Sequence, residues 1–179
     1  NHEVSNAELN FYFIDAVNKF YSTYGNYAAM FGLDVTKPLD EQVISEETGT
    51  WADDFLNSAI ENAKAVYALN DAAAAAGFTL SEEEIASIDL SIANMGAYAT
   101  MYGYSNAEDY MKAMYGNGAT EETLREYVIM NTLANAYQNH YAENLTYEDA
   151  DLRAEEAENF DLYSAFSYNS YYLATSKFL

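Results

Sequence analysis

The stretch TWADDFLNSAIENAKAVYALNDAAAAAG, residues 50–77, predicts one long helix and with it a mainly helical fold. Thr50 can cap the start of this helix, with Asp53 at the third helical position. Gly77 follows a run of alanines and is expected to end the helix in a left-handed conformation. Between these ends, apolar and small residues recur every three or four positions, which indicates one buried face. They are Trp51, Phe55, Ala59, Ala63, Val66 and Tyr67.

Similar start signals on both sides of this stretch predict further helices. Each expected helix follows a serine or threonine whose hydroxyl can accept a hydrogen bond from the first turn, and most end near a glycine or asparagine. The expected helices cover about residues 6–30, 82–102, 106–115, 121–144 and 147–159, after Ser5, Ser81, Ser105, Thr120 and Thr146. Leu39 to Thr48 has no clear pattern and stays unassigned.

The last twenty residues change character, because tyrosine and phenylalanine alternate with small polar residues from residue 163. This alternation predicts a short strand up to Leu173, which could pair with residues near Val4. We therefore expect a mainly α fold with short terminal β-strands. A helical domain is expected at residues 1–160, and a tail that carries the strand at residues 161–179.

The charge of the chain limits its partners. Lysine and arginine total 7 against 29 aspartate and glutamate residues, a formal net charge of −22. Such a surface repels nucleic acid and anionic membranes, and it leaves positive or neutral unfolded segments as partners. The alternative, given equal weight, is that the acidity only maintains solubility.

Residues that carry chemistry are scarce. Cysteine is absent, which excludes disulfides and thiol catalysis. The two histidines, His2 and His140, are far apart and belong to no zinc-binding motif. The acidic runs at residues 82–84 and 155–158 lie at helix starts or on outer faces, where helix capping and solvation explain them. We therefore expect no cofactor, no metal ligand and no catalytic residue.

Three segments resemble a known family when they are taken in order. They read DAAAAAGFTLSEEEI (residues 71–85), YGYSNAEDYMKAMYGNGATEETLREYV (residues 102–128) and LTYEDADLRAEEAENFD (residues 145–161). This order is similar to the N-terminal region of SurA- and PrsA-type peptidyl-prolyl isomerases, over about residues 3–173. The resemblance implies a SurA N-terminal-like, trigger-factor C-terminal-like helical fold that cradles unfolded clients outside the cytoplasm of a bacterium.

In that family the helical region leads into a parvulin-type isomerase domain. The segment SYNSYYL, residues 167–173, would correspond to its first strand but lacks the usual histidine. We therefore expect no complete isomerase domain and no catalysis by this chain. The expected partners are unfolded or nascent secreted polypeptides, with a membrane contact only through an upstream lipid anchor.

The eighteen tyrosines and six methionines suit a client-binding surface. Tyrosine offers a large ring and a hydroxyl, and methionine adapts its shape. For any single tyrosine, however, a place in the core is the more frequent explanation. The residues predicted to contact peptide are Phe13, Tyr24, Tyr27, Tyr98, Met101, Tyr102, Tyr137 and Tyr141.

Two other functions stay open at this point. The aromatic first helix could serve a structural module of a surface lipoprotein that forms homodimers. Alternatively, the chain could be part of a peptidyl-prolyl isomerase whose catalytic domain is missing here. A groove lined by tyrosine and methionine favours client binding, and a two-fold interface through residues 6–30 favours assembly.

Overall fold

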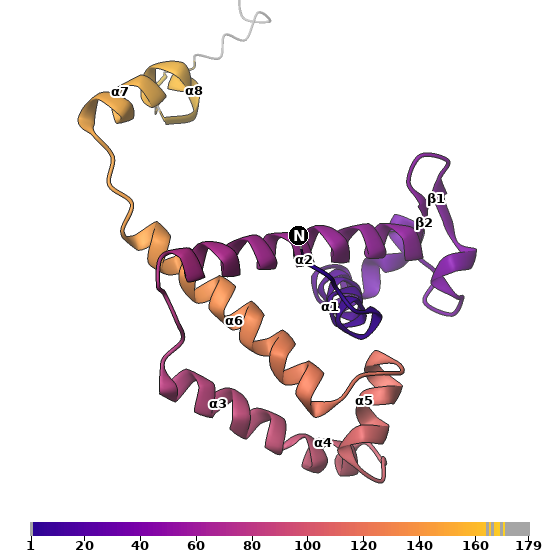
Figure 1. Cartoon of the computed structure of the whole chain (residues 1–179). Helices are drawn as coiled ribbons and strands as arrows, with labels where there is room; N and C mark the ends of the chain where they lie inside the picture. Colours follow the sequence, from indigo (N-terminus) through magenta and orange to yellow (C-terminus); the bar gives the residue numbers. More distant parts are fainter. Residues whose placement is uncertain (1, 164, 166, 169, 171–179) are drawn as a thin grey trace, which may run out of the picture. The chain divides into compact units, whose positions relative to one another are not determined.

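The computed structural model describes residues 2–163, 165, 167–168 and 170, and these are mainly helical, as predicted (Figure 1). Contacts divide the chain into two compact units, Asn1–Ala142 and Glu143–Leu179. No helix among the described residues is long and apolar enough to cross a membrane. The domain boundary expected at residue 160 stays a prediction.

The first unit contains most of the elements. They are α1 (Asn6–Tyr24), the 3₁₀ helices η1 (Gly25–Phe31) and η2 (Leu39–Glu41), β1 (Val43–Ser45), β2 (Gly49–Thr50), α2 (Trp51–Ala75), α3 (Glu82–Ala93), α4 (Met95–Met101), α5 (Ala107–Tyr115) and α6 (Glu121–Glu143). The second unit contains α7 (Asp149–Glu158) and α8 (Phe160–Tyr163), which have no buried residue.

Helix α2 begins and ends as its sequence predicts. The Thr50 hydroxyl accepts a hydrogen bond from the Asp53 amide at 3.2 Å, and the Asp53 carboxylate accepts one from the Thr50 amide at 2.8 Å. At the other end Gly77 has a φ of 67°, which glycine adopts without steric cost. The Phe78 amide then donates to the Ala73 carbonyl at 2.9 Å and closes the last turn.

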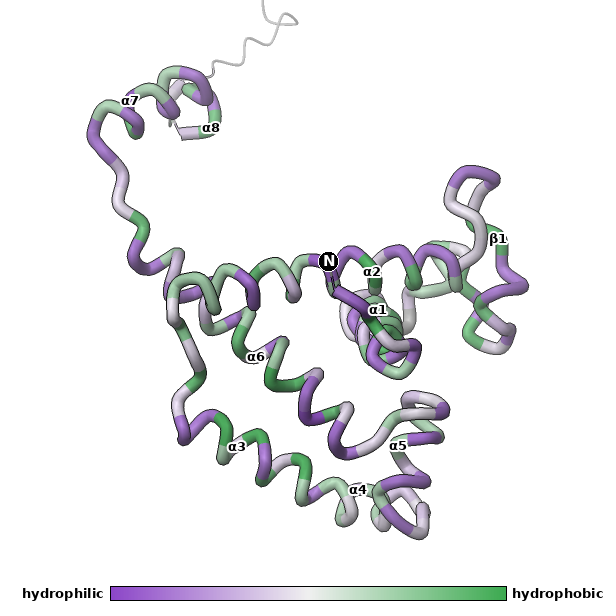
Figure 2. The backbone as a smooth tube through the Cα atoms, in the orientation of Figure 1, coloured by the Kyte–Doolittle hydropathy of each residue, from purple (hydrophilic) through white to green (hydrophobic). Residues whose placement is uncertain are grey.

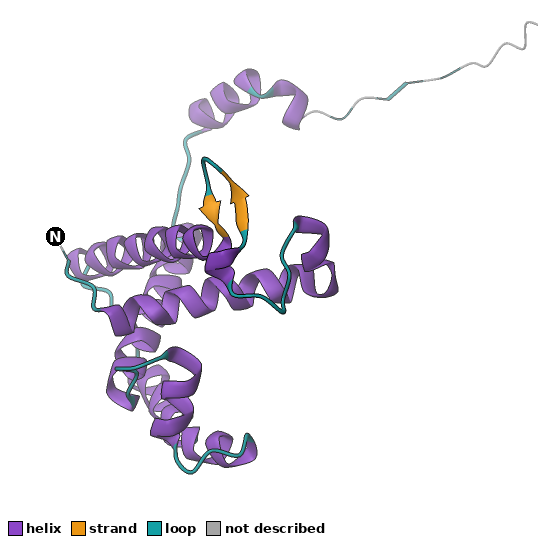
Figure 3. Cartoon of the chain, turned by 90° about the vertical axis from the view of Figure 1, so that its right-hand side faces the viewer, coloured by secondary structure: helices purple, strands orange, loops and turns teal. Residues whose placement is uncertain are grey.

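Helices α1 and α2 lie against each other, and the short hairpin extends from the N-terminal end of α2 (Figure 3). The main core joins α1 and α2 to α3, α5 and α6 through buried residues that include Phe11, Tyr12, Met111 and Tyr127. Hydrophilic and hydrophobic residues alternate along α3 and α6, as expected for helices with one buried face (Figure 2). A smaller core at the other end of α1 centres on Trp51 and Phe55.

Side-chain amides join the helices across this core. Asn70 of α2 donates to the Met130 carbonyl of α6 at 2.9 Å. Asn10 of α1 donates to the Tyr115 carbonyl at the end of α5 at 2.5 Å. Each amide satisfies a carbonyl oxygen on a neighbouring helix, so the bonds fix how the helices pack.

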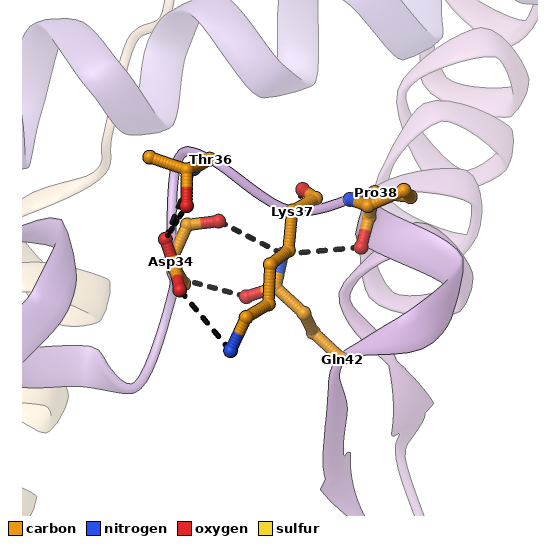
Figure 4. A network of polar contacts seen from close by, with 5 residues as sticks. All are labelled: Asp34, Thr36, Lys37, Pro38 and Gln42. Carbon is orange, nitrogen blue, oxygen red and sulfur yellow. Dashed lines mark hydrogen bonds and ion pairs between the residues drawn. The ribbon is translucent and has the colours of Figure 1, made fainter.

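Residues 33–42 connect η1 to the hairpin around the buried side chain of Gln42 (Figure 4). Its Oε1 accepts from the Asp34 amide at 2.7 Å, and its Nε2 lies 3.0–3.1 Å from the carbonyl oxygens of Asp34, Lys37 and Pro38. Hydrogen bonds from Thr36 and from Lys37 lower the pKa of Asp34 to about 2. One side chain therefore bonds four backbone groups of the connection.

Several expected helix boundaries are wrong. The first helix ends at Tyr24 rather than near Met30, because Gly25 turns the chain at a φ of 44° into a 3₁₀ helix. The helix expected over residues 82–102 divides at Asn94, whose amide bonds to the end of α3 while its carbonyl begins α4.

Two expected N-caps are also wrong. Asn106, not Ser105, caps α5, because the Asn106 side-chain oxygen accepts from the Asp109 amide at 2.8 Å. Helix α7 begins after Glu148 rather than after Thr146. The chosen hydroxyls therefore lie one or two residues too early.

The strands are not at the ends of the described chain, where they were expected. Strands β1 and β2 form an antiparallel pair with Val43 opposite Thr50; β1 lies in the stretch left unassigned and β2 directly follows it. The positive φ of Gly49, 84°, permits this tight turn. Val4 has no regular structure, and Tyr163 belongs to α8 because its amide and that of Leu162 donate to the Asn159 carbonyl. Residues 165, 167, 168 and 170 form no strand either, and the rest of the predicted strand lies outside the described residues.

Candidate functional site

An open groove of about 840 Å³ lies between the C-terminal half of α1 and the N-terminal half of α2. It is lined by Asp15, Ala16, Asn18, Lys19, Phe20, Ser22, Thr23, Tyr24, Asp54, Phe55, Ser58 and Asn62. Its size falls in the range of ligand-binding sites. The lining combines a few aromatic side chains with many short polar ones.

The aromatic part of the groove continues the smaller core outward to the surface. Phe55 is buried, and the Phe20 ring lies 5.7 Å from the Phe55 ring and 5.1 Å from that of Trp51. The Tyr24 ring lies 4.9 Å from Phe20 and is 39% exposed. An apolar side chain that enters the groove would therefore meet rings held in place from below.

Two rows of polar side chains line the groove. Asp54, Ser58 and Asn62 follow one another at four-residue spacing on α2, which places them along one face of the helix. Asp15, Asn18 and Ser22 form the corresponding row on α1 at spacings of three and four.

Much of the hydrogen-bonding capacity of these rows is unused. The side chains of Asn18, Ser58, Asn62 and Asp54 make no hydrogen bond to another described residue. Ser22 and Thr23, by contrast, donate to the Lys19 carbonyl. The first four side chains can therefore pair with groups that a ligand brings.

Tyrosine hydroxyls bond two carboxylates of α1, one of which, Asp15, lines the groove. Tyr127 of α6 donates a hydrogen bond to the Asp15 carboxylate, and Tyr67 of α2 donates one to Glu8 of α1 at 2.8 Å. Burial, followed by the bond to Asp15, raises the pKa of Tyr127 well above its usual range, and burial raises that of Tyr12 to about 12. The Tyr127 and Tyr67 hydroxyls stay protonated at neutral pH, so they serve as donors that orient the Asp15 and Glu8 carboxylates.

The groove suits recognition by contact and hydrogen bonding. Its lining offers ring faces, neutral amides and hydroxyls, two carboxylates and one ammonium group. Elsewhere in the described part of the chain, no three histidine, aspartate or glutamate side chains come together as metal ligands would.

The structure separates the eight residues predicted to contact peptide into three groups. Phe13, Tyr24 and Tyr27 belong to α1 and η1, where Phe13 is half-buried with its ring 6.3 Å from that of Phe55. Of the three, Tyr24 alone lines the groove, and Tyr27 is exposed on η1.

The other two groups lie away from the groove. Tyr98, Met101 and Tyr102 form one exposed face of α4, with Tyr102 stacked 5.8 Å from Tyr110. Tyr137 and Tyr141 belong to the last turns of α6, where Tyr141 is exposed. None of these five residues lines the groove, and their contact with peptide stays a prediction.

The polar side chains of the groove escaped sequence reasoning. Asn18, Ser58 and Asn62 read as ordinary solvent-facing positions of amphipathic helices. The four-residue spacing of Asp54, Ser58 and Asn62 is the one sequence signal of this row. It indicates a binding surface only once the row on α1 is known to face the same groove.

Comparisons of this chain with protein-family models, with curated proteins and with solved structures find no match in any of the three.

Proposed function

We propose that this chain is a chaperone domain that binds short extended segments of unfolded polypeptide in the α1–α2 groove, without itself catalysing a reaction. The observation that carries the proposal is the combination of the exposed Tyr24 ring and the half-buried Phe20 ring with polar side chains that have no internal partner. The resemblance to SurA- and PrsA-type proteins supports the same function. Together with the absence of cysteine, it also supports a place outside the bacterial cytoplasm.

An unfolded chain presents what this groove can bind. Every residue offers a backbone N–H and C=O, and successive side chains of an extended segment point to opposite sides. The amides of Asn18 and Asn62 can each donate to a carbonyl and accept from an N–H. Every second side chain of the segment can then contact Phe20 and Tyr24.

The dimensions fit a short segment. From Asp54 to Asn62 the polar row of α2 advances by eight residue steps, or about 12 Å at the helical rise of about 1.5 Å per residue. An extended chain rises about 3.3 Å per residue, so about four residues lie along the row. So short a contact gives weak and reversible binding, which suits a protein that holds many different clients.

The assembly alternative retains one supporting observation. Tyr27, Met30 and Phe31 of η1 are 66%, 80% and 51% exposed, and an exposed apolar segment of this kind can form a subunit contact. The rest of the aromatic first helix does not support it, because Phe11 and Tyr12 are buried within the chain.

Suppression of the aggregation of a reduced, unfolding model client tests the proposal, with an isomerase assay on a prolyl peptide beside it. We expect concentration-dependent suppression that Tyr24→Ala weakens. Tyr147→Ala removes a tyrosine that is exposed outside the groove, so it should leave suppression unchanged. If the wild type shows neither activity, the proposal fails and the assembly alternative moves ahead. Isomerase activity without suppression would support the catalytic alternative instead.

A further inference from the structure

The basic residues of this chain are largely occupied by its own carboxylates. All of the seven lysines and arginines except Lys177 lie in the described residues, and four of these six form ion pairs. The pairs are Lys37–Asp34 at 3.2 Å, Lys64–Glu61 and Lys112–Glu108 at 2.7 Å, and Arg125–Asp89 at 2.5 Å. Most of the 29 acidic residues therefore have no basic partner within the described part of the chain.

The groove shares this excess of negative charge. Asp15 and Asp54 lie one on each wall, and Lys19 is the cation of the lining. Tyr127 donates to Asp15, whereas the Asp54 carboxylate accepts no hydrogen bond and forms no ion pair with any described residue. Asp54 is thus the lining carboxylate whose hydrogen-bonding capacity is left entirely to a ligand or to water.

A basic side chain would meet two favourable contacts in this groove. The ammonium of lysine or the guanidinium of arginine can pair with the Asp54 carboxylate, and its alkyl stem or charge can lie over an aromatic ring. Tyr24 and Phe20 supply such rings along the same lining. An acidic side chain would meet Asp54 and the negative field of the whole chain instead.

We infer that the groove selects basic segments, in which lysine or arginine alternates with apolar or aromatic residues, over neutral and acidic segments of the same apolar content. This inference rests on the proposed function and adds the class of client to it. Because the ion pair would form at an open groove, we expect a contribution of about two- to fivefold in affinity at Asp54. The long-range field adds a second component that salt weakens, since the Debye length is about 8 Å at physiological ionic strength.

Three labelled peptides of equal length test the inference by fluorescence anisotropy. They share their aromatic residues and differ only in carrying lysine, glutamine or glutamate at the intervening positions. We expect the affinities to fall in the order lysine, glutamine, glutamate, with a spread that narrows as salt is added. Equal affinities, or tightest binding of the glutamate peptide, would overturn the inference and leave the proposed function standing. Failure of all three peptides to bind would overturn both.

A pair of variants separates the groove from the overall charge. Asp54→Asn and Glu83→Gln each remove one carboxylate from the first turn of a helix, and Glu83 lies on α3 outside the groove lining. We expect Asp54→Asn to weaken the lysine peptide about two- to fivefold more than it weakens the glutamine peptide, and Glu83→Gln to have a smaller effect on the lysine peptide. If both variants lose the same affinity for the lysine peptide, the preference depends on net charge alone. That result would refute selection by the groove. Circular dichroism of each variant confirms that its helices remain folded.

Discussion

Raising the pH above about 10 should destabilise the first unit, because tyrosines that join α1 to its neighbours ionise more readily once the unit unfolds. Tyr67 bonds Glu8, Tyr127 bonds Asp15, and Tyr12 is fully buried in the core. Burial is the largest cause that raises the pKa of each of the three, to about 12 for Tyr12 and above that range for the others. The folded chain keeps these protons at a pH where the unfolded chain loses them.

The size of the effect follows from linkage. A tyrosine that ionises only in the unfolded state lowers the free energy of unfolding by about 1.4 kcal/mol per pH unit above 10. Three such residues give about 4 kcal/mol at about pH 11. This is a large part of the about 5–15 kcal/mol that stabilises a typical domain. These tyrosines contribute their full stabilisation below the pKa of an unfolded tyrosine, near 10. The contribution falls as the pH rises from there toward the pKa in the folded chain.

Urea unfolding at a series of alkaline pH values measures this slope, with the buried Trp51 as the fluorescent reporter. Tyr127→Phe should lose about 1 kcal/mol at neutral pH, with its hydrogen bond. The free energy of unfolding of this variant should also fall less steeply with pH above pH 10, by about 1.4 kcal/mol per pH unit compared with the wild type. Tyr141→Phe, at an exposed position, should retain the wild-type slope.

A role for buried tyrosines is contradicted if the free energy of unfolding falls equally steeply with pH in the wild type and in Tyr127→Phe. It is also contradicted if an absorbance titration of the folded protein shows all eighteen tyrosines ionising together near their ordinary pKa. Either result would mean that the hydroxyls of α2 and α6 are not held protonated by burial.

Three further substitutions test the packing and capping of the first unit, each by chemical or thermal unfolding. Gln42→Leu should cost about 2–4 kcal/mol, because one side chain bonds four backbone groups of the connection; Gln138→Leu on the exposed face of α6 should cost little. Thr50→Ala should cost about 1 kcal/mol through loss of the α2 cap, whereas Thr48→Ala, whose hydroxyl caps no helix, should be close to neutral. Met111→Ala should cost about 2–5 kcal/mol, because the side chain is fully buried in the main core. A neutral result for Gln42→Leu or Met111→Ala would contradict the packing described for that region.

Much of the fold could be predicted from local signals. The limits of α2 follow from Thr50, Asp53 and Gly77, which act within one helical turn and need no tertiary context. The division at Asn94 could not be predicted in this way, because the apolar spacing continues through Ile92, Met95 and Ala99. The hairpin at residues 43–50 was missed because its strands are too short to show alternation.

The candidate site was predictable only in part. Tyr24, which was expected to contact peptide, is the one of the eight predicted residues that lines the groove. Asn18, Ser58 and Asn62 were not, because a polar residue on the outer face of a helix has the same pattern whether it faces water or a ligand. What distinguishes them is the packing of α1 against α2, a contact between residues that are distant in the sequence.

Side-chain amide signals in a nuclear magnetic resonance titration test the central claim most directly. An unfolded client peptide should shift the Asn18 and Asn62 side-chain amides saturably, with one dissociation constant for both. The exposed Tyr98 face of α4 should respond less or only at higher peptide concentration. Shifts confined to α4, or no shift at Asn18 and Asn62 while the peptide is bound, would contradict the claim that clients bind in the α1–α2 groove.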